Sequence, residues 1–301
     1  MGAVKPKRIT RPLDGVLLLD KALGLSSNAA LQQARRLYQA ASAGHTGTLD
    51  PLASGLLPIC FGEATKFSFG LLDADKEYEA LVRLGARTST GDAEGEVLAR
   101  REVNTSHEAV ERVLARFRGA ISQIPPMYSA LKRDGRPLYE YARAGQTVER
   151  PPRAITISRL ELLEFAGESF RIVVRCSKGT YIRALAEDIG EALGCGAHLG
   201  ALRRTGVGRL TVASALPFAS LEDMPPEARD LALLPVDSLI DALPRLALDE
   251  RQQWRFCQGQ LQRSPHDAEG TVRVYSESGR FLGVAEVDAT ANLRPKRLIS
   301  L

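Results

Sequence analysis

Hydrophobic and polar positions along the chain follow two periods, which predict a protein of mixed α and β structure. A short apolar run at residues 14–20 (DGVLLLD) lies between turn-forming and charged residues, as expected of a strand. Other segments of strand-like length either alternate between apolar and polar residues or consist of consecutive apolar residues. The strands predicted from these patterns cover residues 76–84, 96–103, 155–165, 169–176 and 207–212.

Helical spacing of apolar residues predicts helices between these strands. Ser26, Ser27 and Asn28 supply capping side chains for a helix that continues to about Ala40. Ser106 is a cap candidate for a second helix over 106–117. A third helix is expected from Tyr181 to near Gly194, and residues 213–245 are expected to add helices and a connector.

The pattern changes from about Leu246. Two short β-rich runs, at 271–275 and 281–287, are separated by a Ser-Glu-Ser-Gly turn. We therefore predict two domains, at residues 1–245 and 246–301. The alternative is that the C-terminal segment forms only a β-hairpin that packs on the main domain.

Amino-acid composition adds few constraints on the fold or the function. The chain has 301 residues, of which 44% are hydrophobic and 25% charged, and no apolar run approaches the length of a membrane span. The N-terminal sequence MGAVKPKRIT is basic without an apolar stretch behind it, so we expect a disordered tail and not a secretory signal. The four cysteines and four histidines are scattered, which predicts reduced thiols, a cytoplasmic protein, and no metal or other cofactor.

Charge becomes informative at residues 124–153. The net charge of the whole chain is only +4, but this segment has six basic and three acidic residues. Tyr128, Tyr139 and Tyr141 are interleaved with them. Basic residues attract a phosphate backbone and aromatic rings stack on bases, so the segment is a candidate RNA-binding surface. A solvated loop with a short amphipathic helix is the alternative.

The glycine-rich stretch at residues 44–55 (GHTGTLDPLASG) surrounds one carboxylate, Asp50. Pro51 disfavours helical dihedrals at Asp50, and glycines permit tight bends and close approach of a ligand. Such a loop can hold an acidic side chain at the floor of a cleft. A turn with a capping aspartate is the alternative for an isolated Asp-Pro pair.

Three motifs, in this order, resemble those of TruB-type tRNA pseudouridine synthases. They are GVLLLDK at 15–21, GHTGTLDPLASGLLP at 44–58 continuing through GEATK at 62–66, and KGTYIR at 178–183. The resemblance implies an α+β pseudouridine synthase fold with a mixed, mostly antiparallel sheet and packed helices. It also implies an RNA-binding thumb at about 124–153 and a small C-terminal PUA-like β-barrel.

The resemblance also implies roles for individual residues in the first domain. Asp50 is the essential carboxylate, expected to be ionised near neutral pH, and Arg183 pairs with it. Tyr78 contacts the uracil and takes part in removal of its C5 proton.

Further residues are implied to bind the substrate. Tyr181 contacts the flipped base, Leu202 forms an apolar wall, and His45 contacts the RNA. Lys21 is expected to serve the structure or to contact a phosphate. In the C-terminal domain, weaker candidates for phosphate contact are Arg294, Lys296 and Arg297.

The function implied is a cofactor-free isomerase that converts the T-loop uridine of tRNA, position 55 in tRNA numbering, to pseudouridine. The partner is then tRNA, through its T-stem-loop and the acceptor end, with no membrane and no obligatory protein partner. Two alternatives are a non-catalytic RNA-binding or tRNA-folding module and a glycosylase that removes the base. The chemical route at Asp50 stays open among an acylal, a glycal and attack on the base.

Overall fold

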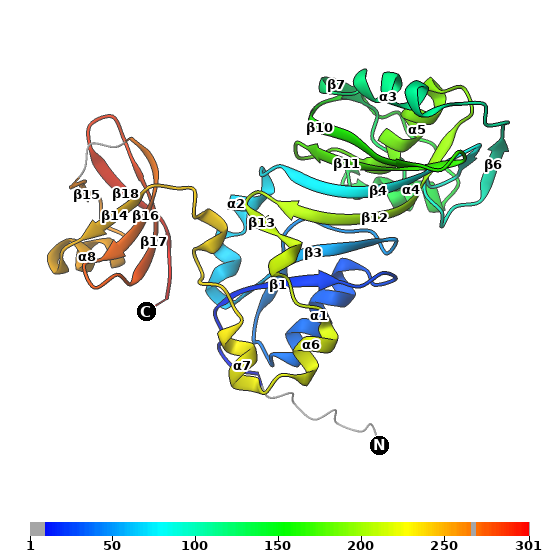
Figure 1. The fold of residues 1–301 in the computed structure, drawn as a ribbon. Helices are drawn as coiled ribbons and strands as arrows, with labels where there is room; N and C mark the ends of the chain where they lie inside the picture. Colours follow the sequence, from blue (N-terminus) through cyan, green and yellow to red (C-terminus); the bar gives the residue numbers. More distant parts are fainter. Residues whose placement is uncertain (1–9, 266–268, 301) are drawn as a thin grey trace.

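The structure is a computed structural model that describes residues 10–265 and 269–300. The predicted N-terminal tail lies outside this range except for Thr10. Figure 1 shows a large N-terminal unit and a smaller C-terminal β unit set to one side of it. None of the helices described is long and apolar enough to cross a membrane.

The large unit is built on a nine-stranded sheet whose main path has the order β1-β3-β12-β4-β11-β10-β7. β3 and β12 are parallel and the other neighbours described are antiparallel, which confirms the expected mixed, mostly antiparallel sheet. The strands are β1 (Gly15–Lys21), β2 (Ala43–His45), β3 (Ala53–Phe61), β4 (Lys76–Leu84), β7 (Gly119–Gln123), β10 (Arg153–Phe165), β11 (Ser169–Cys176), β12 (Ala197–Val207) and β13 (Leu210–Thr211).

Helices cover this sheet in two groups, each with its own hydrophobic core. α1 and α6 pack on β1 and β3, whereas α3 and α5 pack on β4, β10, β11 and β12. Tyr78 and Leu202 contact both cores, so they mark the seam between them. The helices of this unit are α1 (Ser27–Leu37), α2 (Phe69–Leu72), α3 (His107–Ala115), α4 (Leu138–Arg143), α5 (Ile182–Ala192), α6 (Phe218–Asp223) and α7 (Pro226–Leu231), with 3-10 turns at Gly62–Phe67, Val212–Ser214 and Ser238–Ile240.

Several boundaries differ from the sequence-based prediction. The first helix ends at Leu37 and not near Ala40, because Gln39 adopts a left-handed φ of 53°. The strand predicted at 207–212 is wrong: β12 covers Ala197–Val207, and only the two residues of β13 follow it. The predicted strand at 96–103 is the shorter β6 (Val97–Arg100), paired with β5 (Ala86–Thr88).

The segment at 124–152 is an insertion at the edge of the sheet. Gln123 at the end of β7 pairs with Arg153 at the start of β10, so the chain leaves the sheet and returns at the same point. The insertion contains a two-stranded hairpin, β8 (Lys132–Arg133) and β9 (Arg136–Pro137), followed by α4. Both ends of the insertion thus join the sheet at one point of its edge.

The C-terminal unit is a second sheet with the order β14-β16-β17-β18-β15. It has its own core, to which α8 contributes Phe256. The region is therefore more than a single hairpin on the main domain. Its elements are β14 (Arg245–Leu248), α8 (Glu250–Cys257), β15 (Gln262–Arg263), β16 (Gly270–Ser276), β17 (Phe281–Val287) and β18 (Asn292–Leu298).

Candidate active site

Asp50 lies in the loop that connects β2 to β3. Ser27 on α1 fixes this loop: its hydroxyl accepts a hydrogen bond from the Leu49 N–H (2.7 Å) and donates one to the Leu49 carbonyl (2.9 Å). The Asp50 carbonyl accepts from the Ala53 N–H at 3.0 Å, closing the turn into β3. The loop is thus held on both sides of the carboxylate, and Asp50 projects from a defined position.

Arg183, in the first turn of α5, pairs with Asp50 at 2.8 Å between Nη2 and Oδ2. The two side chains differ in burial, since that of Arg183 is 8% exposed and that of Asp50 is 47% exposed. Arg183 also donates to the carbonyls of Thr90 (3.0 Å) and Tyr128 (2.8 Å). The guanidinium is therefore an immobile cation behind an accessible carboxylate.

Asp92 is a further member of this cluster that the sequence motifs did not identify. Its Oδ2 lies 3.6 Å from Arg183 Nε, and its side chain is only 4% exposed. Thr90 and the Glu94 N–H also donate to the Asp92 carboxylate. Arg183 thus lies between a buried and an accessible carboxylate. Only proximity in space reveals the role of Asp92, because nothing in the sequence around it marks it.

A cavity of about 290 Å³ opens in front of the Asp50–Arg183 pair. The predicted residues Tyr78, Tyr181 and Leu202 line it together with the pair. Tyr78 comes from β4, Leu202 from the neighbouring β12, and Tyr181 from the N-cap of α5. Residues scattered over more than 150 positions thus meet at the seam between the two cores.

The two tyrosines of the cavity are held as neutral phenols. Burial raises the pKa of the Tyr78 phenol, an effect that the nearby Arg204 partly opposes. Burial likewise raises the pKa of Tyr181. The backbone of Tyr181 is fixed by Gln123, whose side chain accepts from the Tyr181 N–H (2.9 Å) and donates to its carbonyl (3.1 Å). Both rings therefore offer neutral surfaces next to a charged carboxylate.

Lys21 and His45 are not among the residues that line this cavity. Lys21 is fully buried and donates to the carbonyls of Leu25 (2.6 Å) and Ala22 (3.0 Å). The burial of the ammonium favours the structural role, and the expected phosphate contact stays a prediction. Burial lowers the pKa of Lys21, and Asp50 counteracts part of that effect.

His45 is half-buried on β2, where it pairs with Ile59. Its Nδ1 is buried with no hydrogen-bond partner among the residues described. Burial and the charge of Arg204 lower the pKa of His45, so its imidazole is neutral near neutral pH. Its expected contact with RNA stays a prediction.

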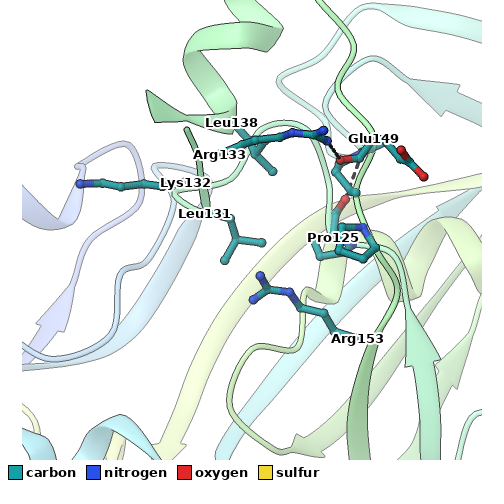
Figure 2. Close-up of a pocket in the computed structure, with 9 residues that line it drawn as sticks. Pro125, Leu131, Lys132, Arg133, Leu138, Glu149 and Arg153 are labelled. Atoms are coloured by element: carbon teal, nitrogen blue, oxygen red, sulfur yellow. Dashed lines mark hydrogen bonds between the residues drawn. The ribbon is translucent and has the colours of Figure 1, made fainter. Parts of the chain in front are cut away.

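The insertion at 124–153 contributes Ser129 and Ala130 to the cavity and encloses a second pocket of about 450 Å³. Figure 2 shows Arg133 and Arg153 on opposite sides of this second pocket, with Leu131 and Pro125 between them and the Lys132 side chain extending away. Arg133 is held by a hydrogen bond to the Glu149 carbonyl at 2.6 Å. Cationic and apolar groups thus gather beside the cavity that contains Asp50.

The three C-terminal candidates for phosphate contact, Arg294, Lys296 and Arg297, differ in their surroundings. All are exposed, but Lys296 pairs with Glu286 and the guanidinium of Arg297 lies 5.2 Å from the ring centroid of Phe69. Arg294 has no ion pair within the described part of the chain. Arg294 is therefore the most available of the three for a phosphate.

Comparisons with known proteins agree along almost the whole chain. Residues 35–182 match the model of the TruB family pseudouridylate synthase N-terminal domain. Residues 183–241 match the tRNA pseudouridylate synthase B C-terminal domain, and residues 244–299 match the model of the C-terminal part of pseudouridine synthase II TruB.

Two relatives named tRNA pseudouridine synthase B illustrate the similarity. That of Azoarcus sp. (strain BH72) is 59% identical and covers 98% of this chain and 97% of its own. That of Cupriavidus metallidurans is 56% identical over 99% and 98% of the two chains.

Among solved structures, that of a Cbf5–Nop10–Gar1 complex matches with a TM-score of 0.72 and 24% identity, over 94% of this chain and 84% of the other. Because the sequence identity is low, this match is evidence for the fold alone. The expected fold, a pseudouridine synthase domain followed by a small PUA-like β domain, is confirmed. The chain belongs to the TruB family of pseudouridylate synthases.

Proposed function

We propose that this chain isomerises the T-loop uridine of tRNA to pseudouridine, with Asp50 as the essential carboxylate. Near full-length relatives named tRNA pseudouridine synthase B support the enzyme class and the tRNA substrate. The observation on which the site depends is a half-exposed Asp50, tied to a buried Arg183, at a cavity lined by two tyrosines.

The reaction breaks the N1–C1′ bond of uridine and forms a C5–C1′ bond. C5 loses a proton and N1 gains one, so the composition of the nucleotide is unchanged. The base must first leave its stack, which costs a few kcal/mol. Stacking on aromatic side chains recovers roughly 1–3 kcal/mol per base. Tyr78 and Tyr181 line the cavity, which supports a stacking role for them.

Asp50 can act as a nucleophile at the sugar, as a base, or as a stabiliser of positive charge at C1′. Arg183 keeps the carboxylate ionised and fixes its direction. Because burial raises the pKa of Tyr78, its phenol can accept the C5 proton only if it passes its own proton on at the same time. Leu202 limits the space beside the base.

Other surfaces would bind the rest of the tRNA. The basic groups of the insertion at 124–153 serve as the thumb that closes on the T-stem-loop. Arg294 and its neighbours in the C-terminal domain contact the acceptor end. The cysteines described are free, which agrees with a reducing compartment such as the cytoplasm.

The decisive experiment compares wild type with Asp50→Asn on a T-stem-loop transcript that carries tritium at C5 of uridine. We expect wild type to release tritium and to leave pseudouridine at a single position. Asp50→Asn should abolish release and change the affinity for the transcript by less than about threefold, or about 0.65 kcal/mol. A transcript with cytidine at that position is the substrate control.

Two results would replace the proposal with its alternatives. Wild-type protein that binds the transcript without releasing tritium would be an RNA-binding or tRNA-folding module. Free uracil among the products would identify a base-removing glycosylase.

A further inference from the structure

A cavity of about 540 Å³ lies on the face of the large sheet that α3 and α5 do not cover. Along β4, Ala80 belongs to the core beneath these helices, so Leu81 and, two residues later, Arg83 lie on the opposite face. Leu81 and Arg83 both line this cavity. Tyr78 is on the same face as Ala80 and lines the cavity that contains Asp50. The two cavities therefore lie on opposite faces of the sheet.

Three neighbouring strands place polar side chains next to one another on this face. In the sheet register, Arg83 of β4 is opposite His198 of β12 on one side and Ser169 of β11 on the other. All three residues line the cavity. Residues directly opposite each other in antiparallel strands have Cβ atoms about 4.5–5.5 Å apart. A guanidinium, an imidazole and a hydroxyl are thus neighbours in the wall of this cavity.

The hairpin of β5 and β6 adds a second guanidinium, that of Arg100. Nδ1 of His198 lies 3.1 Å from the carbonyl oxygen of Ala86 on β5, and Ala86 is opposite Arg100 in the hairpin register. A carbonyl oxygen can only accept, so the Nδ1–H of His198 donates this hydrogen bond. The bond attaches the hairpin to the sheet, so that Arg100 and Arg83 line the same cavity.

Arg83 and Arg100 have no anionic partner within the protein. Both are exposed, and within residues 10–265 and 269–300 neither side chain has an ion pair or a hydrogen bond. Of the described residues that line the cavity, Glu168 is the only acidic one, and it forms no ion pair with either arginine. Six other arginines on or beside these strands each pair with a carboxylate: Arg87, Arg101, Arg159, Arg171, Arg175 and Arg203. The two arginines of the cavity are thus available for an anion from outside.

The backbone beneath Arg83 is shaped for its side chain. The register of β12 shifts between Leu199 and Ala201, which marks a bulge at Gly200. A Cβ atom at Gly200 would lie 3.0 Å from both Cγ and Nε of Arg83. A glycine inside a strand often marks such a close approach. The side chain of Arg83 therefore lies along the sheet over Gly200, which keeps its guanidinium at the cavity.

We propose that this cavity binds the phosphate group of a nucleotide, with Arg83 and Arg100 as its cations. The planar guanidinium group matches the geometry of phosphate oxygens and pairs with them through two hydrogen bonds. Ser169 adds a hydroxyl, and the apolar Leu81 and Val97 line the space beside these groups, as a base or a sugar requires. The site is separate from that of the isomerisation, because it lies on the other face of the sheet.

Isothermal titration calorimetry with adenosine 5′-monophosphate (AMP) tests the proposal. This probe is chosen because a uridine nucleotide can also enter the cavity that contains Asp50. We expect the wild-type protein to bind AMP at one site with a dissociation constant below about 1 mM, and not to bind adenosine, which lacks the phosphate. Arg83→Gln and Arg100→Gln should each weaken AMP binding by about tenfold or more.

Arg175→Gln is the matched control, since Arg175 is an exposed arginine on the same face of the sheet that pairs with Asp75. It should bind AMP as tightly as wild type. Arg83→Gln should convert the T-stem-loop transcript at the wild-type rate, because Arg83 does not line the cavity that contains Asp50. AMP binding and isomerisation are thus measured separately, and the failure of one proposal leaves the other intact.

Glu168→Gln is a second test, which does not depend on the loss of an arginine. It removes the acidic group from the cavity wall, so it should tighten AMP binding by about two- to fivefold through reduced repulsion of the phosphate. Because Glu168 is exposed, we expect the variant to fold as wild type does. Unchanged or weaker AMP binding by Glu168→Gln would count against a phosphate at this position.

A short oligoadenylate with hydroxyl ends distinguishes the source of the phosphate. If it competes with AMP and Arg83→Gln weakens its binding, the site binds a backbone phosphate of RNA, whereas binding of AMP alone identifies a free nucleotide. Three results would overturn the proposal: no binding of AMP up to about 10 mM, equal binding of AMP and adenosine, or AMP binding that neither arginine variant weakens.

Discussion

Asp50 and Arg183 form an ion pair that contributes little to folding. Pairs in which one side chain is half-exposed stabilise a fold by less than about 1 kcal/mol, and Asp50 is 47% exposed. Arg183 has three other partners that hold it without Asp50. The pair therefore gives the carboxylate a fixed direction and leaves one of its sides open to a ligand.

Lys21 allows a first prediction at the scale of single residues. Lys21→Met removes a buried ammonium and leaves the carbonyls of Ala22 and Leu25 without a donor. We expect the free energy of unfolding to fall by about 1.5–3 kcal/mol, measured by urea denaturation. The folded variant should bind the T-stem-loop transcript as tightly as wild type, because the side chain is buried.

The control for this prediction is Lys178→Met. Lys178 is exposed, and within residues 10–265 and 269–300 it pairs only with the exposed Asp73, so its loss should change stability little. A Lys21→Met protein of wild-type stability that binds the transcript poorly would contradict the structural role and return Lys21 to the RNA-binding surface.

The sequence allowed some of the site residues to be predicted and not others. Asp50, Arg183 and Tyr181 lie in long contiguous motifs, so their resemblance to a family was visible from the chain alone. Asp92, Gln123 and Arg204 act through contacts with residues distant in the chain. No local pattern distinguishes a buried aspartate, glutamine or arginine from a solvated one.

At the scale of elements, Gln123 links the base of the insertion at 124–152 to the wall of the cavity. Gln123→Leu would leave the Tyr181 N–H without its partner beside the buried position of Gln123, and the Tyr181 carbonyl would keep only the Leu185 N–H at 3.0 Å. We expect a loss of about 1–3 kcal/mol in the free energy of unfolding. We also expect slower single-turnover conversion, because Tyr181 would no longer be held against the cavity.

Ser122→Ala is the matched control, since Ser122 is the exposed neighbour on the same strand. It should leave both stability and rate at wild-type values. If Gln123→Leu unfolds at the same urea concentration as wild type, the two hydrogen bonds do not hold the N-terminus of α5.

Elements with a regular period were predictable, and elements shaped by their neighbours were not. β4 matches its alternating segment, and α3 begins after the predicted Ser106 cap. β12 was missed because bulges at Leu199/Ala201 and Arg204/Gly206 interrupt its alternation. Bulges and close strand contacts depend on partners that a single-sequence pattern does not contain.

At the scale of the whole molecule, a small interface joins the two sheets. Phe67 and Ile240 of the large unit pack against Val284 of the C-terminal sheet. Glu63 accepts hydrogen bonds from the N–H (2.8 Å) and the hydroxyl (3.3 Å) of Ser300. Lys66 pairs with Glu63 and donates to the Leu298 carbonyl at 2.9 Å. Leu298 and Ser300 are thus bound to the turn that follows β3.

The Glu63 contacts predict how this interface responds to pH. Burial alone would raise the pKa of Glu63, but hydrogen bonds from Lys66 and Ser300 outweigh it and hold the pKa below its ordinary value of 4.5. A carboxyl group with a lowered pKa stabilises the folded state above its unfolded pKa, and that contribution is lost as pH falls through the folded pKa. The interface should therefore be intact near neutral pH and weaken below about pH 4.5.

Glu63→Gln tests this response. At pH 7 we expect the variant to lose about 0.5–1 kcal/mol, a value reduced for solvent screening because Lys66 is partly exposed. The difference from wild type should shrink as the pH is lowered, since wild-type Glu63 then becomes protonated, and urea denaturation at several pH values measures it. Glu227→Gln, on the exposed face of α7, should show no difference at any pH. A difference between Glu63→Gln and wild type that stays constant with pH would mean that the charge of Glu63 does not hold the C-terminal domain.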